Sequence, residues 1–120
     1  MNPDPDKAYD EAVLAVEAVA CPLVCPPTNK RRTLGTVTAD LRKQATMWEL
    51  ELGDTTTNAP MIVDRLIPML ELLWHGQSRH AGSANSRRQT QVEGESAVHL
   101  AAILVQWLGS GVLRRKSAGS

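Results

Sequence analysis

Residues that favour β-strands are scarce in this 120-residue sequence: phenylalanine is absent, tyrosine occurs once, and we identify no alternating run that predicts a strand. Cysteine occurs twice, too rarely for a disulfide framework, and two thiols with three scattered histidines do not form a recognisable zinc set. An excess of charge is also missing, because 13 acidic residues balance 13 basic ones. This balance excludes binding of a polyanion over the whole surface but not by a local basic cluster. We expect no metal ion and no cofactor.

Long hydrophobic runs are lacking as well. The longest, Ala97 to Leu108, is interrupted by polar residues and is shorter than the roughly 20 residues that span a bilayer. The acidic and proline-rich start, Pro3 to Asp6, does not resemble a secretory signal. We therefore expect a cytoplasmic protein without a membrane span. Its length predicts one domain, residues 1–120, with an ordered core of about 6–115 and a short polar tail.

A first amphipathic helix is predicted over about residues 6–20. Asp4 is a suitable N-cap, Pro5 fits the first helical position, and Pro22 is expected to end the helix. A proline-rich connector follows. Two thiols are expected to be free and buried or half-buried in it: Cys21 and Cys25.

Two further helices are indicated by apolar residues at steps of three and four. The second extends from about Leu34 to Leu52, with Thr33 or Thr36 as its cap. The third starts near residues 58–60, and Pro68 is expected to kink it or split it in two. Three tryptophans fall on apolar helical faces and are predicted to anchor the core: Trp48, Trp74 and Trp107.

The last helix, about residues 92–112, is apolar on nearly all sides between 97 and 108. Such a helix must be covered on most sides, either at the centre of the domain or by a second subunit. Three residues are our candidates for that interface: His99, Ala102 and Gln106. Together the patterns predict an all-α fold, a compact bundle of four to five helices.

Basic residues form three clusters, at 30–32, 79–88 and 114–116. If the clusters converge in space, they create a surface for an anionic ligand such as RNA; if they diverge, they are solubilising segments. The second cluster lies in a glycine- and serine-rich loop, 77–91. The candidate anion-binding residues in these clusters are Lys30, Arg31, Arg32, Arg87 and Arg88.

The order of four fragments resembles the abortive-infection C-terminal domain. The fragments are Ala8-Tyr-Asp-Glu-Ala-Val-Leu-Ala-Val-Glu-Ala-Val, Thr33-Leu-Gly, Arg79-His-Ala-Gly and Ala97-Val-His-Leu-Ala-Ala-Ile-Leu-Val-Gln-Trp. That family resembles the HEPN helical domains, many of which are RNases or RNA-binding modules in phage defence and toxin–antitoxin systems. Over about residues 7–115, the resemblance implies a helical bundle, often a homodimer, that acts on RNA or a protein partner.

In catalytic HEPN relatives, about four to six residues separate an arginine from the histidine that follows it. Here the upstream residues 73–75 are Leu, Trp and His, and Arg79 directly precedes His80 instead. The resemblance therefore implies only His80, as the proton-transfer group of a metal-independent endoribonuclease whose usual motif is not intact. Such a reaction also needs a cation to stabilise the phosphate, and we expect Arg79 to supply it from the predicted loop by a different route. The alternative is a non-catalytic dimerisation or protein-interaction module, such as an antitoxin-like or phage-encoded accessory protein.

Overall fold

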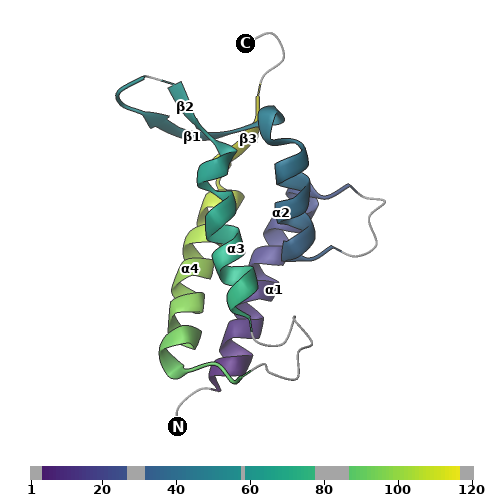
Figure 1. Cartoon of the computed structure of the whole chain (residues 1–120), viewed down its shortest axis with the longest axis vertical. Coiled ribbons are helices and arrows are strands. Elements are labelled where there is room, and N and C mark those ends of the chain that lie inside the picture. The colour runs from purple at the N-terminus through teal and green to yellow at the C-terminus, as the bar shows by residue number, and fades with distance from the viewer. Residues whose placement is uncertain (1–3, 27–31, 58, 78–86, 117–120) are drawn as a thin grey trace.

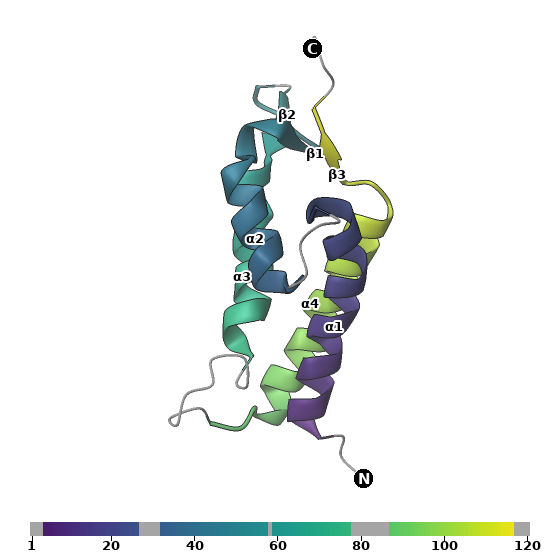
Figure 2. The same ribbon diagram turned by 90° about the vertical axis from the view of Figure 1, so that its right-hand side faces the viewer.

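Four helices form two layers, each of two helices, in the computed structural model, which describes residues 4–26, 32–57, 59–77 and 87–116. One layer pairs α1 (Pro5–Val24) with α4 (Gln91–Gly109), and the other pairs α2 (Leu34–Lys43) with α3 (Ile67–Gly76) (Figure 1, Figure 2). A small sheet lies at one end of the helices, and the start of α1 lies at the opposite end. None of these helices has an apolar stretch long enough to cross a membrane.

The helix starts follow the side chains that cap them. The Asp4 carboxylate accepts a hydrogen bond from the backbone N–H of Asp6 at 3.0 Å, which confirms the predicted start of α1. Thr33 and Thr36 form a capping box at the start of α2. Thr90 and Glu93 form another at the start of α4, close to its predicted position. These side chains satisfy amide groups that have no partner within the first helical turn.

The predicted end of the first helix is wrong, because α1 continues through Pro22 to Val24. A proline inside a helix removes one N–H donor and strains the preceding turn. Here it lies in the last turn, on the exposed side, so little helix remains to be disrupted. The residue after the helix, Cys25, is its C-cap and has an extended backbone.

The expectation of an all-α fold is also wrong. Strand β1 (Trp48–Asp54) pairs antiparallel with β2 (Ala59–Ile62) and with β3 (Leu113–Arg115), in the order β2-β1-β3. The segment that looked like the end of the second helix is therefore β1, preceded by a 3₁₀ turn at Ala45–Met47. Trp48 is a core residue as predicted, but it lies on a strand, where the Arg115 guanidinium covers its ring at 4.6 Å from the ring centroid.

The region expected to form the start of the third helix is instead β2, followed by a 3₁₀ turn at Val63–Arg65. Contrary to the prediction, the third helix is neither kinked nor split at Pro68 but begins there: α3 starts at Ile67 with Pro68 in its first turn. A proline is tolerated there since the first-turn amides lack helical partners in any case.

The core lies between the two helical layers and extends under the sheet. It is almost entirely aliphatic, and the largest fully buried side chains are Trp48, Leu34, Leu41, Leu66, Ile67, Leu70, Leu73 and Leu104. The outer side of α4 is not covered within the described residues: Val92, Val98 and Ile103 are exposed. Helices α1 and α3 thus cover the inner side of α4, and its outer side is exposed within the described residues.

Candidate functional site

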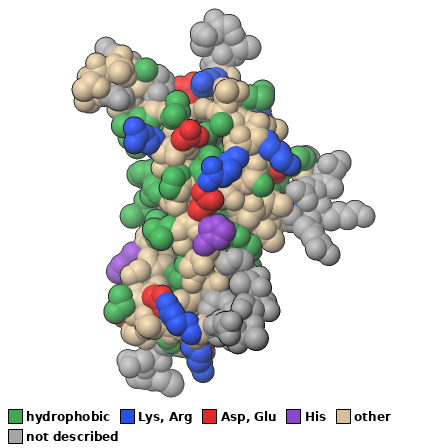
Figure 3. Space-filling view, in the orientation of Figure 1, with side chains coloured by type: hydrophobic (Ala, Val, Ile, Leu, Met, Phe, Trp, Pro, Cys, Tyr) green, Lys and Arg blue, Asp and Glu red, His purple; other side chains and the backbone are tan. Residues whose placement is uncertain are grey.

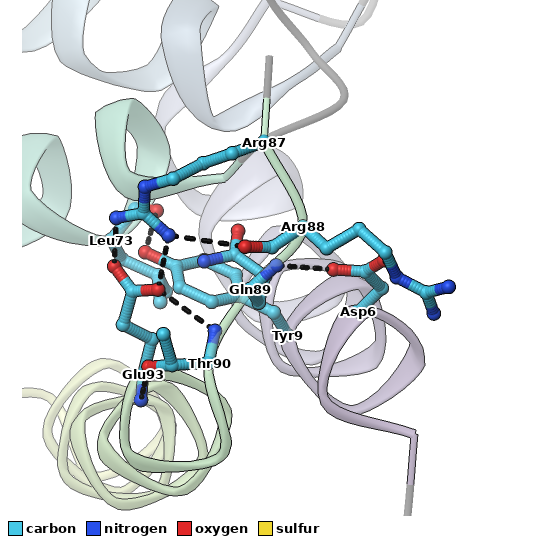
Figure 4. A network of polar contacts seen from close by, with 8 residues as sticks. All are labelled: Asp6, Tyr9, Leu73, Arg87, Arg88, Gln89, Thr90 and Glu93. Atoms are coloured by element: carbon cyan, nitrogen blue, oxygen red, sulfur yellow. Dashed lines mark hydrogen bonds and ion pairs between the residues drawn. The ribbon is translucent and has the colours of Figure 1, made fainter.

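The end of the bundle away from the sheet carries a network of polar contacts between α1, α3 and the segment that leads into α4 (Figure 4). Its most buried charged member is Asp6, which is 5% exposed. One oxygen, Oδ1, accepts a hydrogen bond from the backbone N–H of Gln89 at 2.7 Å, and Oδ2 accepts one from Arg88 Nε at 3.1 Å. The first turn of α1 therefore holds the segment that enters α4.

Arg87 is paired with Glu93 in the same network. Its Nη1 and Nη2 donate to the two carboxylate oxygens of Glu93, each at 2.7 Å. Glu93 also accepts from the backbone N–H of Thr90 at 2.9 Å. The hydrogen bonds from Arg87, followed by that from Thr90, lower the pKa of Glu93 from 4.5 to about 2.

The end of α3 is tied to α1 by two further hydrogen bonds. The Tyr9 hydroxyl donates to the backbone carbonyl of Leu73 at 2.7 Å, and Gln77 Nε2 donates to Asp10 Oδ1 at 2.8 Å. Burial, and then the negative charge of Glu93, raise the pKa of Tyr9 above its usual range. A β-carbon on Gly76 would lie only 2.2 Å from the Tyr9 hydroxyl oxygen, so this close approach requires glycine.

Arg79 and His80, the predicted catalytic pair, lie outside the described residues. The residues on either side of their segment are described: Gln77 and Arg87 are both held at this end of the bundle by the contacts above. The candidate anion-binding residues Arg87 and Arg88 are thus bound to carboxylates of the same chain. Arg88 Nη2 adds a second ion pair, 3.6 Å from Asp4 Oδ1.

A second polar cluster lies on the layer formed by α2 and α3. Arg42 Nη2 donates to Glu71 Oε1, and His75 Nε2 lies 3.9 Å from Glu71 Oε2. The side chains of Arg42 and His75 are 58% and 66% exposed, whereas that of Glu71 is 27% exposed. Basic, acidic and histidine side chains lie next to one another on this face in Figure 3. Sequence reasoning missed this cluster because Arg42 is 29 positions from Glu71, although the spacing of Glu71 and His75 indicates a helical pair.

The basic clusters do not converge in the part of the chain that the structure describes. Lys30 and Arg31 lie outside it, and Arg32 is half-buried with its Nε enclosed and without a hydrogen-bond partner. Arg114, in the third cluster, pairs with Glu49 and Glu51 on β1. About 28 Å of helix α4 separates that cluster from Arg87 and Arg88. For the described members, the clusters are separate surface features.

The two cysteines are free and buried, as predicted. Burial is the largest cause that raises the pKa of Cys21 to about 11, followed by the proximity of Cys25 and Glu17. Burial also raises the pKa of Cys25. Thiols this hard to ionise are poor nucleophiles. The described residues contain no group of three or more metal-ligating side chains.

A groove between α1 and α4 opens on the outer side of the helical pair. It has a volume of about 380 Å³ and is lined mainly by apolar side chains, among them Ala8, Ala15, Val98, Ala102 and Val105. The predicted interface residues His99, Ala102 and Gln106 are all exposed on α4. The Glu95 carboxylate accepts a hydrogen bond from Gln91 Nε2 at 3.1 Å, in the polar strip that also contains His99.

Comparisons of this chain with protein-family models, with curated proteins and with solved structures find no match.

Proposed function

We propose that this chain is a HEPN-like, abortive-infection-type helical domain that binds RNA in the cytoplasm and acts in prokaryotic defence or toxin–antitoxin biology. The observation that carries the proposal is the double anchor of the segment with Arg79 and His80. Asp6 and Asp10 of α1 hold the residues that follow and precede it. A loop whose two ends are fixed on a rigid scaffold is a common way to present binding and catalytic residues.

The chemistry that we propose is metal-independent RNA cleavage. The 2′-oxygen of a ribose attacks phosphorus, the bond from phosphorus to the 5′-oxygen breaks, and the 5′-oxygen takes up a proton. His80 takes the proton of the 2′-hydroxyl, and water supplies the proton of the leaving oxygen. Arg79 stabilises the charge that grows on the phosphate oxygens. In a form of this proposal without cleavage, Arg79 and His80 of this chain bind RNA and leave it intact.

Purified protein incubated with labelled single-stranded RNA at low salt tests this function. We expect binding or cleavage in the wild type and a loss of either in His80→Ala. His99→Ala is a suitable control, because it removes an exposed histidine from the outer side of α4. A wild-type protein that neither binds nor cuts RNA would refute the proposal, as would His80→Ala with full activity.

A second candidate function is a protein-interaction module, and the apolar groove between α1 and α4 favours it. We propose a second copy of this chain as its partner, since the exposed side of α4 is continuous with the groove through Val98 and Ala102. Sedimentation of Ala102→Glu tests this. Monomers in the variant and dimers in the wild type are expected, and identical sedimentation of the two would exclude the groove as a dimer interface.

A further inference from the structure

The carboxylate of Glu71 brings together an arginine and a histidine that come from different helices. Arg42 lies in the last turn of α2, His75 lies in the last turn of α3, and each approaches a different oxygen of Glu71. The carboxylate is the least exposed of the three side chains, at 27%, so the guanidinium and the imidazole are the parts that face solvent. We name these residues the Arg42–Glu71–His75 cluster.

We infer that the Arg42–Glu71–His75 cluster binds a phosphodiester group of RNA. A guanidinium has five N–H donors in a planar fork. Glu71 Oε1 cannot accept all of them, so donors of Arg42 remain for a ligand, and the fork matches the oxygens of a phosphate. An imidazole adds a positive charge when it is protonated. The two groups are held side by side by Glu71, so less side-chain freedom is lost when an anion binds.

The position of the cluster connects it to the proposed function, on which this inference rests. His75 is two residues before Gln77, the last described residue before the segment that contains Arg79 and His80. The exposed guanidinium of Arg42 suits the oxygens of the sugar–phosphate backbone. Contacts of this kind position a nucleic acid without reading its sequence.

Glu71 has the role of a positioning residue in this site, and its charge makes that role testable. A carboxylate repels a phosphate, so a surface that attracts RNA only through its net charge would bind more tightly when Glu71 is neutralised. If Glu71 instead holds Arg42 and His75 in place, Glu71→Gln must weaken binding, because the amide is a poorer partner for the guanidinium and the imidazole.

The experiment measures binding of a labelled single-stranded oligouridylate by fluorescence anisotropy over a range of salt concentrations. The variants are Arg42→Gln, His75→Gln and Glu71→Gln. Lys43→Gln removes a neighbouring positive charge from α2, and Arg65→Gln removes an exposed positive charge from the 3₁₀ turn Val63–Arg65, so these two are the matched controls. Circular dichroism of each variant verifies that the helices are retained.

We expect Arg42→Gln to lower the affinity about tenfold, as for the loss of one charge-assisted hydrogen bond. The dependence of log K on log salt should become less steep by about 0.7, the value for one phosphate on a single strand. His75→Gln and Glu71→Gln should also bind more weakly, while the two controls stay close to the wild type. A change in the imidazole proton resonances of His75 on addition of the oligonucleotide should accompany binding.

Three results would overturn the inference: Arg42→Gln with wild-type affinity, controls that lose as much as the cluster variants, or Glu71→Gln that binds more tightly. If the wild type binds RNA in any of these cases, the proposed function survives and only the location of the site is wrong. If the wild type binds no RNA at low salt, both the proposed function and this site are refuted.

Discussion

The carboxylate of Asp6 accepts a hydrogen bond from the backbone N–H of Gln89, a residue 83 positions later in the chain. Asp6 is in the first turn of α1 and nearly fully buried, and Gln89 is buried just before α4. This contact fixes the described segment that leads into α4, residues 87–90, against the first helix. Its strength therefore governs how firmly the proposed RNA-binding segment is held.

Replacement of Asp6 tests this anchor. We expect Asp6→Ala to lower the free energy of unfolding by about 1–3 kcal/mol, because the buried N–H of Gln89 loses its acceptor. Asp6→Asn should lose less, since the amide oxygen can still accept that hydrogen bond while the ion pair with Arg88 is lost. Urea unfolding measures the stabilities, and hydrogen exchange at Gln89 reports the contact itself. Equal losses in the two variants would show that the charge, and not the acceptor, matters.

A double-mutant cycle tests the contact between Tyr9 and Gly76. Gly76→Ala should cost about 1–3 kcal/mol, because its β-carbon would lie 2.2 Å from the Tyr9 hydroxyl oxygen. Tyr9→Phe removes that oxygen and should cost about 1 kcal/mol through the lost hydrogen bond to Leu73. In the Tyr9→Phe background, Gly76→Ala should be considerably milder. Additive losses in the double variant would show that the two residues do not interact as described.

The pair formed by Arg87 and Glu93 predicts a dependence of stability on acid. The folded-state pKa of Glu93, about 2, lies below its ordinary value of 4.5, so the ionised carboxylate stabilises the fold above about pH 4.5. This stabilisation is lost as the pH falls through about 2. Near neutral pH, we expect Glu93→Gln to unfold at a lower denaturant concentration than the wild type. Below pH 4.5, its free energy of unfolding should fall less steeply with pH than that of the wild type.

Glu95→Gln provides the control for that measurement, because it removes the same charge from the exposed side of α4 and leaves Arg87 paired with Glu93. The effect of Glu93→Gln is expected to be modest since both partners of the ion pair are accessible to water. Identical pH profiles for Glu93→Gln and the wild type would refute the contribution of this pair to stability.

The sequence predicts the helices of this fold better than its strands, for reasons visible in particular residues. Asp4, Pro5 and Thr33 define helix starts through local hydrogen bonds and backbone geometry, so their roles can be predicted from neighbours in the chain. The run from Trp48 to Leu52 alternates apolar and acidic residues and so carries a strand signal. Leu41, Ala45, Trp48 and Leu52 also follow a helical spacing, which predicts a helix over the same residues, and in the fold the strand pairing prevails.

The candidate site depends more on contacts that are distant in sequence. Asp6 with Gln89, Tyr9 with Leu73 and Arg42 with Glu71 are all pairs that only the folding of the helices brings together. Composition and periodicity carry no information on such pairs. Arg87 and Arg88 show the consequence: in sequence they belong to a basic cluster, and in the fold they are bound to carboxylates.

Replacement of either glycine of α4 by alanine should change the stability, and the room for the added β-carbon decides whether the change is a loss or a gain. A β-carbon on Gly94 would lie 3.0–3.1 Å from Cβ, Cα and the carbonyl oxygen of Pro5, two of which are backbone atoms that cannot move without shifting α1. Gly94→Ala should therefore destabilise the protein by about 1–3 kcal/mol. Gly109 has no atom within 4 Å of the same position.

Gly109→Ala is thus the matched substitution, because it adds the same methyl group to the same helix without a clash. Alanine favours a helical backbone by about 0.8–1.0 kcal/mol over glycine in a helix interior, and part of that gain should appear in the last turn of α4 as increased stability. Urea unfolding of the two variants compares the signs directly. If Gly94→Ala were as stable as Gly109→Ala, the first turn of α1 would not pack against α4 as closely as the contact at Pro5 requires, and the anchor at Asp6 would lose its rigid support.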